Sequence, residues 1–97
     1  MVQLDKQFRL TIPQDIREVV NLNFNEEIRI YSKLKNDIHY LILSNDKELN
    51  YACFGIAKFD QKSRFYISKE LRNYLNASTE TNFLVFSLKG ELLIKML

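Results

Sequence analysis

Apolar and polar residues alternate along several short segments of the chain, which is the pattern of half-buried β-strands. Residues 9–12 and 64–67 show it plainly, and four of their side chains should point into a core: Leu10, Ile12, Phe65 and Ile67. Longer segments at 28–34 and 38–43, and at 83–88 and 91–96, flank short turns at 35–37 and 89–90. This arrangement predicts two β-hairpins.

A short helix is predicted after each of the strands at 9–12 and 64–67. Pro13 suits a first helical turn because it has no N–H to satisfy, and the Ser68 hydroxyl can cap a free backbone donor. Apolar residues follow at helical spacing and should form the inward faces, namely Ile16, Val19 and Val20 in one helix and Leu71, Tyr74 and Leu75 in the other. Asn21 and Asn76 suit a left-handed stop at the helix ends.

The two halves of the chain repeat one pattern. A shift of 55 positions aligns residues 4–31 with 59–86 without a gap, and five of the 28 pairs are identical: Asp5/Asp60, Arg9/Arg64, Ile12/Ile67, Arg17/Arg72 and Asn21/Asn76. A unit of this size cannot hold a stable core alone. We therefore predict a mainly β fold with two short helices, in which repeat one (1–43), a linker (44–53) and repeat two (54–97) build a single β-barrel.

Each repeat contains an Asp, then an Arg four residues later, a strand, a helix start and a second Arg, at 5–17 and 60–72. This order resembles the AbrB/SpoVT/MazE/MraZ superfamily, loosely D-x-x-G-R-hydrophobic-x-[IV]-P-x-x-[IL]-R. The resemblance implies a ββαββ unit and a swapped-hairpin barrel. Family members usually build this barrel from two chains, and we expect one chain to carry both halves here, as in MraZ. It also implies a DNA-binding transcription regulator, cytoplasmic and associated with the nucleoid, that forms a dimer.

The sequence departs from this pattern at positions that matter for DNA binding. Phe8 and Ser63 stand where the family has Gly, so the tight turn must adopt another geometry or accept strain. Glu18 and Asn73 stand where DNA-binding members often have a second basic residue. The helix-start Pro of the pattern survives only as Pro13. The missing Pro in repeat two and the missing second basic residues both subtract from the expected affinity for DNA.

The basic residues of the two motifs are the candidate DNA contacts. Guanidinium groups bind phosphate bidentately and can reach guanine edges. The predicted set is Arg9, Arg17, Lys58, Lys62, Arg64, Lys69 and Arg72. Repeat two should dominate, because residues 54–97 hold seven basic and four acidic side chains against six of each in residues 1–43. Two alternatives stay open: each strand Arg forms a local ion pair with its Asp, or the helix arginines are ordinary solvated residues.

Composition narrows the function classes further. The chain is 46% hydrophobic and 27% charged with a net charge of only +2, which is typical of a globular protein and does not by itself announce a polyanion partner. His39 and Cys53 are each the single residue of their type and lie far apart in sequence, so we predict no enzyme activity, no metal site and no cofactor or small-molecule substrate. With no apolar run long enough to cross a bilayer and no leader-like start, we expect a cytoplasmic protein without a membrane partner.

Two further expectations concern surfaces. The strand at 83–86 is apolar on both sides, so the outward side chains of Leu84 and Phe86 should either contact another subunit or be covered by the linker around Tyr51 and Phe54. The second candidate function, a protein-interaction or assembly module without DNA binding, would use such a surface. Cys53 is expected to be a small buried residue.

Overall fold

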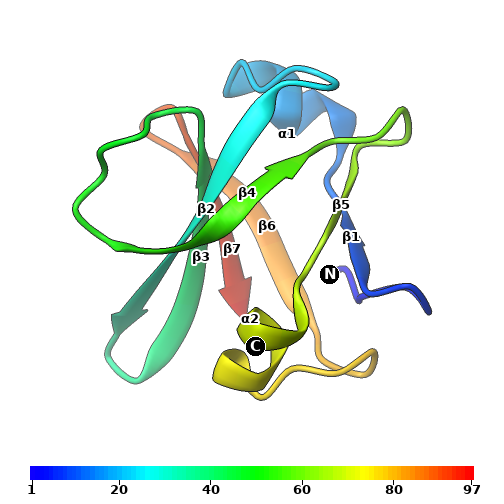
Figure 1. The fold of residues 1–97 in the computed structure, drawn as a ribbon, viewed down its shortest axis with the longest axis vertical. Helices are drawn as coiled ribbons and strands as arrows, with labels where there is room; N and C mark the ends of the chain where they lie inside the picture. Colours follow the sequence, from blue (N-terminus) through cyan, green and yellow to red (C-terminus); the bar gives the residue numbers. More distant parts are fainter.

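The computed structural model describes residues 1–97 and contains seven strands and two short helices (Figure 1). In chain order they are β1 (Arg9–Thr11), α1 (Gln14–Val19), β2 (Glu27–Lys35), β3 (Ile38–Ser44), β4 (Ala52–Lys58), β5 (Arg64–Tyr66), α2 (Lys69–Leu75), β6 (Phe83–Leu88) and β7 (Glu91–Met96). The predicted mainly β class with two short helices is confirmed. Neither helix has the length and apolar character that a membrane crossing requires.

The strands form two sheets. Five of them pair in the order β4-β2-β3-β7-β6, and β1 pairs with β5 in a separate antiparallel ribbon. Leu10 lies opposite Phe65 in that ribbon, and these are equivalent positions of the two repeats. A pseudo-two-fold axis therefore passes between them. The strands do not close into one continuous barrel, so the closed barrel expected from the sequence is not confirmed.

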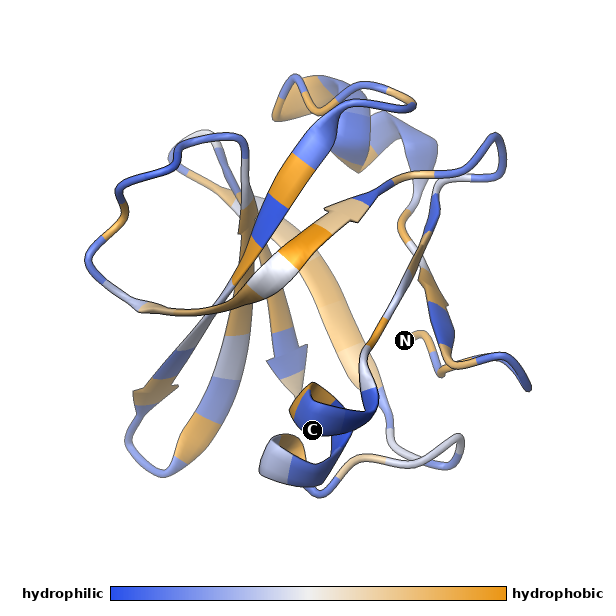
Figure 2. Cartoon of the chain, viewed as in Figure 1, coloured by the Kyte–Doolittle hydropathy of each residue, from blue (hydrophilic) through white to orange (hydrophobic).

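Both hairpins lie where the alternating pattern predicts them. The β2–β3 turn places Asn36 and Asp37 at positive φ, and the β6–β7 turn does the same with Lys89 and Gly90. Two consecutive residues with positive φ match the twist of the flanking strands. Figure 2 shows the alternation along β2 as successive hydrophilic and hydrophobic bands.

The start of repeat one differs from the expected ββαββ unit. β4 supplies the first strand of repeat two, whereas in repeat one only Val2 is paired, through an isolated bridge to Phe83. In the segment before Asp5 only Val2 pairs with a strand, while Leu4 is buried in the core and Met1 is exposed, so this segment contributes an edge contact and not a full strand.

The helices begin and end largely as predicted. Ser68 Oγ accepts a hydrogen bond from the Leu71 N–H, and Asn76 ends α2 in the left-handed conformation. Asn21 also has positive φ, one residue after the Val20 cap of α1.

The prediction that Val19 faces inward is wrong, because it is 71% exposed. A helix of six residues presents only a narrow stripe to the core, and Ile16 and the cap residue Val20 pack there, each partly buried.

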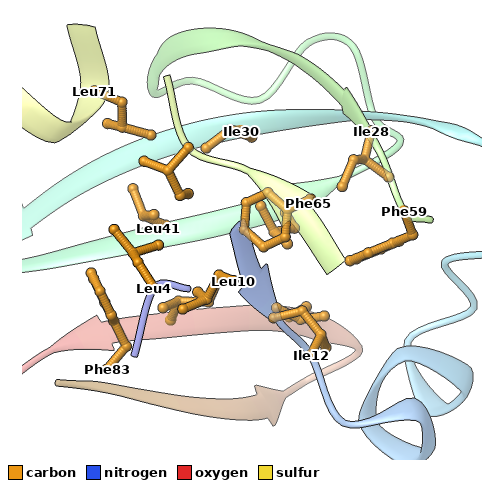
Figure 3. Close-up of a cluster of buried hydrophobic side chains, with 14 of the residues drawn as sticks. Leu4, Leu10, Ile12, Ile28, Ile30, Leu41, Phe59, Phe65, Leu71 and Phe83 are labelled. Carbon is orange, nitrogen blue, oxygen red and sulfur yellow. The ribbon is translucent and has the colours of Figure 1, made fainter. Parts of the chain in front are cut away.

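The core lies between the ribbon and the inner face of the large sheet. Figure 3 shows Leu10 and Phe65 of the ribbon among side chains from β2, β3 and β6. The four ribbon and helix-start residues predicted to point inward are buried, as are Leu71 and Leu75. Tyr74 is half exposed but its ring packs on Phe54 and His39.

The prediction that Cys53 is buried is wrong. Cys53 lies on β4, where it pairs with Tyr31 of β2. It is exposed because β4 forms an open edge of the large sheet. The local sequence around it, with aromatic residues on both sides, does not reveal which strand becomes an edge.

Candidate nucleic-acid interface

The turns before β1 and β5 have the same hydrogen-bonding geometry. Asp5 Oδ1 accepts bonds from the backbone N–H groups of Gln7 and Arg9, and its Oδ2 accepts one from Arg9 Nε, all at 2.9 Å. Asp60 makes the equivalent bonds to Lys62 and Arg64, with an Nε–Oδ2 distance of 2.7 Å. The predicted local ion pairs therefore form in both repeats.

These bonds lower the pKa of both carboxyl groups. For Asp5 the main cause is the Arg9 backbone N–H, assisted by the Arg9 side chain and the Gln7 N–H against a partial loss of solvent. For Asp60 the loss of solvent is the largest single influence and raises the pKa, but the backbone and side chain of Arg64 and the Lys62 N–H together outweigh it. Each Asp is thus held in its charged form beside its arginine.

The residues directly before the two strand arginines adopt the conformation for which Gly is normally chosen. Phe8 has φ 62° and Ser63 has φ 59°, and both lie in the left-handed region. This conformation costs roughly 1–2 kcal/mol for a residue with a side chain. Both turns are therefore built with side chains at left-handed positions, at some cost in backbone strain.

The ribbon presents both strand arginines on one face. Arg9 lies opposite Tyr66 and Thr11 lies opposite Arg64, so these four side chains share the face away from the buried pair Leu10 and Phe65. The two arginines are separated by two positions along the ladder, about 7 Å. Because each Asp engages only Nε, both terminal amino groups of each arginine lack a partner within the chain.

The two helix arginines contact the turn of the opposite repeat. Arg17 of α1 donates from Nε to Ser63 Oγ at 3.0 Å and from Nη1 to the Leu22 carbonyl at 2.9 Å. Arg72 of α2 places its guanidinium carbon 3.7 Å from the centre of the Phe8 ring. Ser63 and Phe8 are equivalent positions, so the two contacts are related by the pseudo-two-fold axis.

These contacts exclude the alternative that the helix arginines are ordinary solvated residues, and they give both arginines a structural role. Arg72 Nη1 also donates to the Ile67 carbonyl at 2.6 Å and the Tyr66 hydroxyl at 3.3 Å. Arg17 and Arg72 are therefore partly buried side chains that join the repeats and not solvated residues of a polar helix face. Sequence comparison of the repeats identifies their equivalence but carries no signal that each reaches across to the other repeat.

The predicted lysines do not gather in one place. Lys62 lies in the second turn and Lys58 at the end of β4, opposite Glu27, whereas Lys69 opens α2 beyond the far end of β5. Figure 1 shows α1 and α2 at opposite ends of the molecule. The basic cluster of repeat two is thus divided, with Arg64 on the ribbon between its parts.

The predicted set does not include Lys6, an exposed basic residue in the turn before β1. Lys6 lies in the first turn, so each turn carries one exposed lysine, Lys6 in the first and Lys62 in the second. The repeat alignment contains the signal, because Lys6–Gln7 corresponds to Gln61–Lys62 with the order of the two residue types exchanged. Elsewhere, no three histidine, cysteine or carboxylate side chains are grouped so that they could hold a metal ion.

Comparison with known proteins adds no assignment. No family model, no curated protein and no solved structure matches the chain.

Proposed function

We propose that this protein is a small DNA-binding transcription regulator of the AbrB-like type that contacts double-stranded DNA through the outward face of the β1–β5 ribbon. One observation carries the proposal: both strand arginines lie on this face with their terminal amino groups unpartnered, while Asp5 and Asp60 hold the Nε side. An arginine held in this way presents a preset fork of donors, which is the geometry that phosphate oxygens and guanine edges accept.

The shape of the ribbon supports the same proposal. Two antiparallel strands lie about 5 Å apart, and a two-stranded ribbon fits the major groove of B-DNA, which is about 12 Å wide. Lys6 and Lys62 in the turns at the two ends of the ribbon are exposed and available for flanking phosphates. Arg17 and Arg72 act in this scheme as positioning residues, because they fix the turns that hold Arg9 and Arg64.

The kinship with AbrB-like proteins belongs to the proposal. It is supported by the tandem Asp–Arg motif, the left-handed residues at the two Gly positions and the exchange of contacts between the repeats. In this view each repeat supplies one ribbon strand and one hairpin, which corresponds to a swapped-hairpin arrangement made within one chain. A regulator of this kind would work in the cytoplasm on nucleoid DNA.

A salt-titrated binding assay with a random-sequence duplex tests the proposal. The test variant is Arg9→Gln with Arg64→Gln. The matched control is Lys33→Gln with Lys35→Gln, which removes the same charge from the outer face of the large sheet. With four to six phosphates engaged, the log–log salt slope of the natural protein should be roughly −4 to −5.

The two arginine substitutions should make this slope shallower by about 2 and weaken binding at least about tenfold at 100 mM salt, since each removes about one phosphate contact. The control should change binding less than about threefold. Equal losses in the two variants would show that net charge, and not the ribbon, drives binding. Arg64→Gln alone should weaken DNA binding more than Arg9→Gln alone, because repeat two carries more basic residues than repeat one.

A protein-interaction module remains the second candidate, and one observation favours it. The outer face of the large sheet carries a groove of about 270 Å³, lined by four apolar side chains of β3, β6 and β7 and by Lys33 and Lys35 of β2. Absence of any DNA binding at 50 mM salt would favour this candidate over the regulator.

A further inference from the structure

The open edge of β6 is the least protected part of the large sheet. β6 and β4 are its two edge strands. β4 is interrupted by a bulge opposite Arg29–Tyr31 and ends in Lys58, features that discourage pairing with another strand. β6 contains no charged residue and no proline, and exposes Leu84 at 42% and Leu88 at 53%. Leu84 is therefore not covered by the linker, which lies at the opposite edge of the sheet beside β4.

The backbone groups that face this open edge can be identified. The Phe83 N–H and carbonyl bond to Val2 at 2.8 and 2.9 Å, so they point away from β7. Orientation alternates along a strand, and Val85 and Ser87 therefore present their N–H and carbonyl groups to the same side. These groups find no partner within the chain.

We propose that a second copy of this protein binds at this edge, with the two β6 strands antiparallel about a two-fold axis at Phe86. In this register Val85 of each copy pairs with Ser87 of the other, and all the open backbone groups are satisfied. An axis at Val85 would need Phe83, which Val2 already occupies. An axis at Ser87 would need Lys89, which lies in the turn with φ 52°.

The side chains are self-complementary in the same register. On the outer face, Phe86 meets Phe86 of the second copy, and Leu84 meets Leu88. Within each copy Phe86 lies beside Leu93 of β7, so an apolar row of Leu93, Phe86, Phe86 and Leu93 runs across the junction. In the neighbouring row Leu84 has Lys95 beside it and Leu88 has Glu91, so the flanking charges on the two copies are opposite in sign.

The groove described above lies at this junction. Phe86, Leu88 and Leu93 form part of its lining. Leu84 of the second copy would lie beside Leu88 at the edge of the groove and cover part of its apolar surface. Val2 pairs antiparallel with Phe83, so the chain from Val2 to Met1 runs toward Leu84, and Met1, which is 81% exposed, would move aside for Leu88 of the second copy.

Sedimentation of charge-reversed variants tests this dimer. Phe86→Lys and Phe86→Glu each place like charges directly opposite one another on the two-fold axis, so each protein alone should be monomeric at concentrations where the natural chain is a dimer. Mixed in equal amounts, they should restore a dimer that contains one copy of each, because the charges on the axis are then opposite. Ile56→Lys places the same charge on the other edge strand, at a residue 53% exposed, and should leave the dimer intact.

A second variant removes one hydrogen-bond donor from the open side of β6 and leaves the pairing with β7 intact. Ser87→Pro deletes an N–H that faces the open side and not β7, so the hairpin should persist while dimer formation falls at least about tenfold. Circular dichroism verifies that each variant is folded. A natural chain that stays monomeric at about 0.5 mM, folded Phe86 variants that dimerise alone, or a mixture that stays monomeric would each overturn the proposal. None of these results bears on DNA binding by the ribbon.

Discussion

The contact between Arg72 and Phe8 should be measurable as a coupling energy between the two repeats. Phe8 adopts a left-handed conformation in a position where glycine would be unstrained, and its ring lies 3.7 Å from the Arg72 guanidinium. We expect the stacking to offset much of that strain. The perturbation is a double-mutant cycle with Phe8→Leu, which keeps an apolar side chain but removes the aromatic face, and Arg72→Met, which keeps the length of the side chain without its charge.

The magnitude follows from the degree of burial. Cation–π contacts contribute about 0.5–1 kcal/mol when exposed and about 2 kcal/mol when desolvated. Both side chains are partly buried, so we expect a coupling of about 1 kcal/mol. In a domain of this length, 1 kcal/mol corresponds to roughly 4–8 °C in Tm.

Urea unfolding of the natural protein, the two single variants and the double variant supplies the four free energies of unfolding. A matched cycle on Arg17 and Phe59, whose guanidinium–ring distance is 5.8 Å, should show a coupling below about 0.5 kcal/mol. A coupling near zero for Arg72 and Phe8, or equal coupling in the two cycles, would refute the idea that stacking secures the first turn.

The remaining predictions concern the turns and the helix caps. Because both carboxyl groups have a lowered pKa in the folded state, the stability they contribute is present above their unfolded pKa and is lost as the pH falls below about 4. Asp5→Asn with Asp60→Asn should therefore reduce the free energy of unfolding at pH 7 and flatten its dependence on pH between 5 and 2.5; a curve parallel to that of the natural protein would contradict this. Asn76→Ala should cost about 1 kcal/mol because alanine tolerates the left-handed cap poorly, whereas Asn76→Gly should cost little, and thermal unfolding distinguishes the two. Ser68→Ala should lower stability by about 1 kcal/mol through loss of the bond from the Leu71 N–H, with exposed Asn73→Ala in the same helix as the control.

The local features of the fold were predictable because they depend on neighbouring residues. Alternation located the hairpins, and the turns at 36–37 and 89–90 contain residues that tolerate positive φ. The Asp–Arg pairs likewise depend on a spacing of four residues around one turn. The repeat alignment also anticipated that Leu10 and Phe65 would be equivalent, and the structure places them opposite each other.

Features that depend on contacts between distant segments were not predictable. Nothing near Arg17 or Arg72 indicates that each side chain reaches the turn of the other repeat. Cys53 is exposed because β4 is an edge, and strand order is decided by the pairing of the whole sheet. Closure of a barrel would require pairing between the ribbon and the large sheet, and the alternating pattern of single strands does not specify such pairs.

An NMR titration of the isotope-labelled protein with a DNA duplex tests the central claim most directly, because it reports which residues meet the ligand. The claim predicts that the Nε–H signals of Arg9 and Arg64 and the backbone amides of Thr11 and Tyr66 shift together with a single dissociation constant. Signals from Lys33 and Lys35, on the outer face of the large sheet, should stay in place. Shifts confined to that outer face, with the ribbon signals unchanged, would contradict the account.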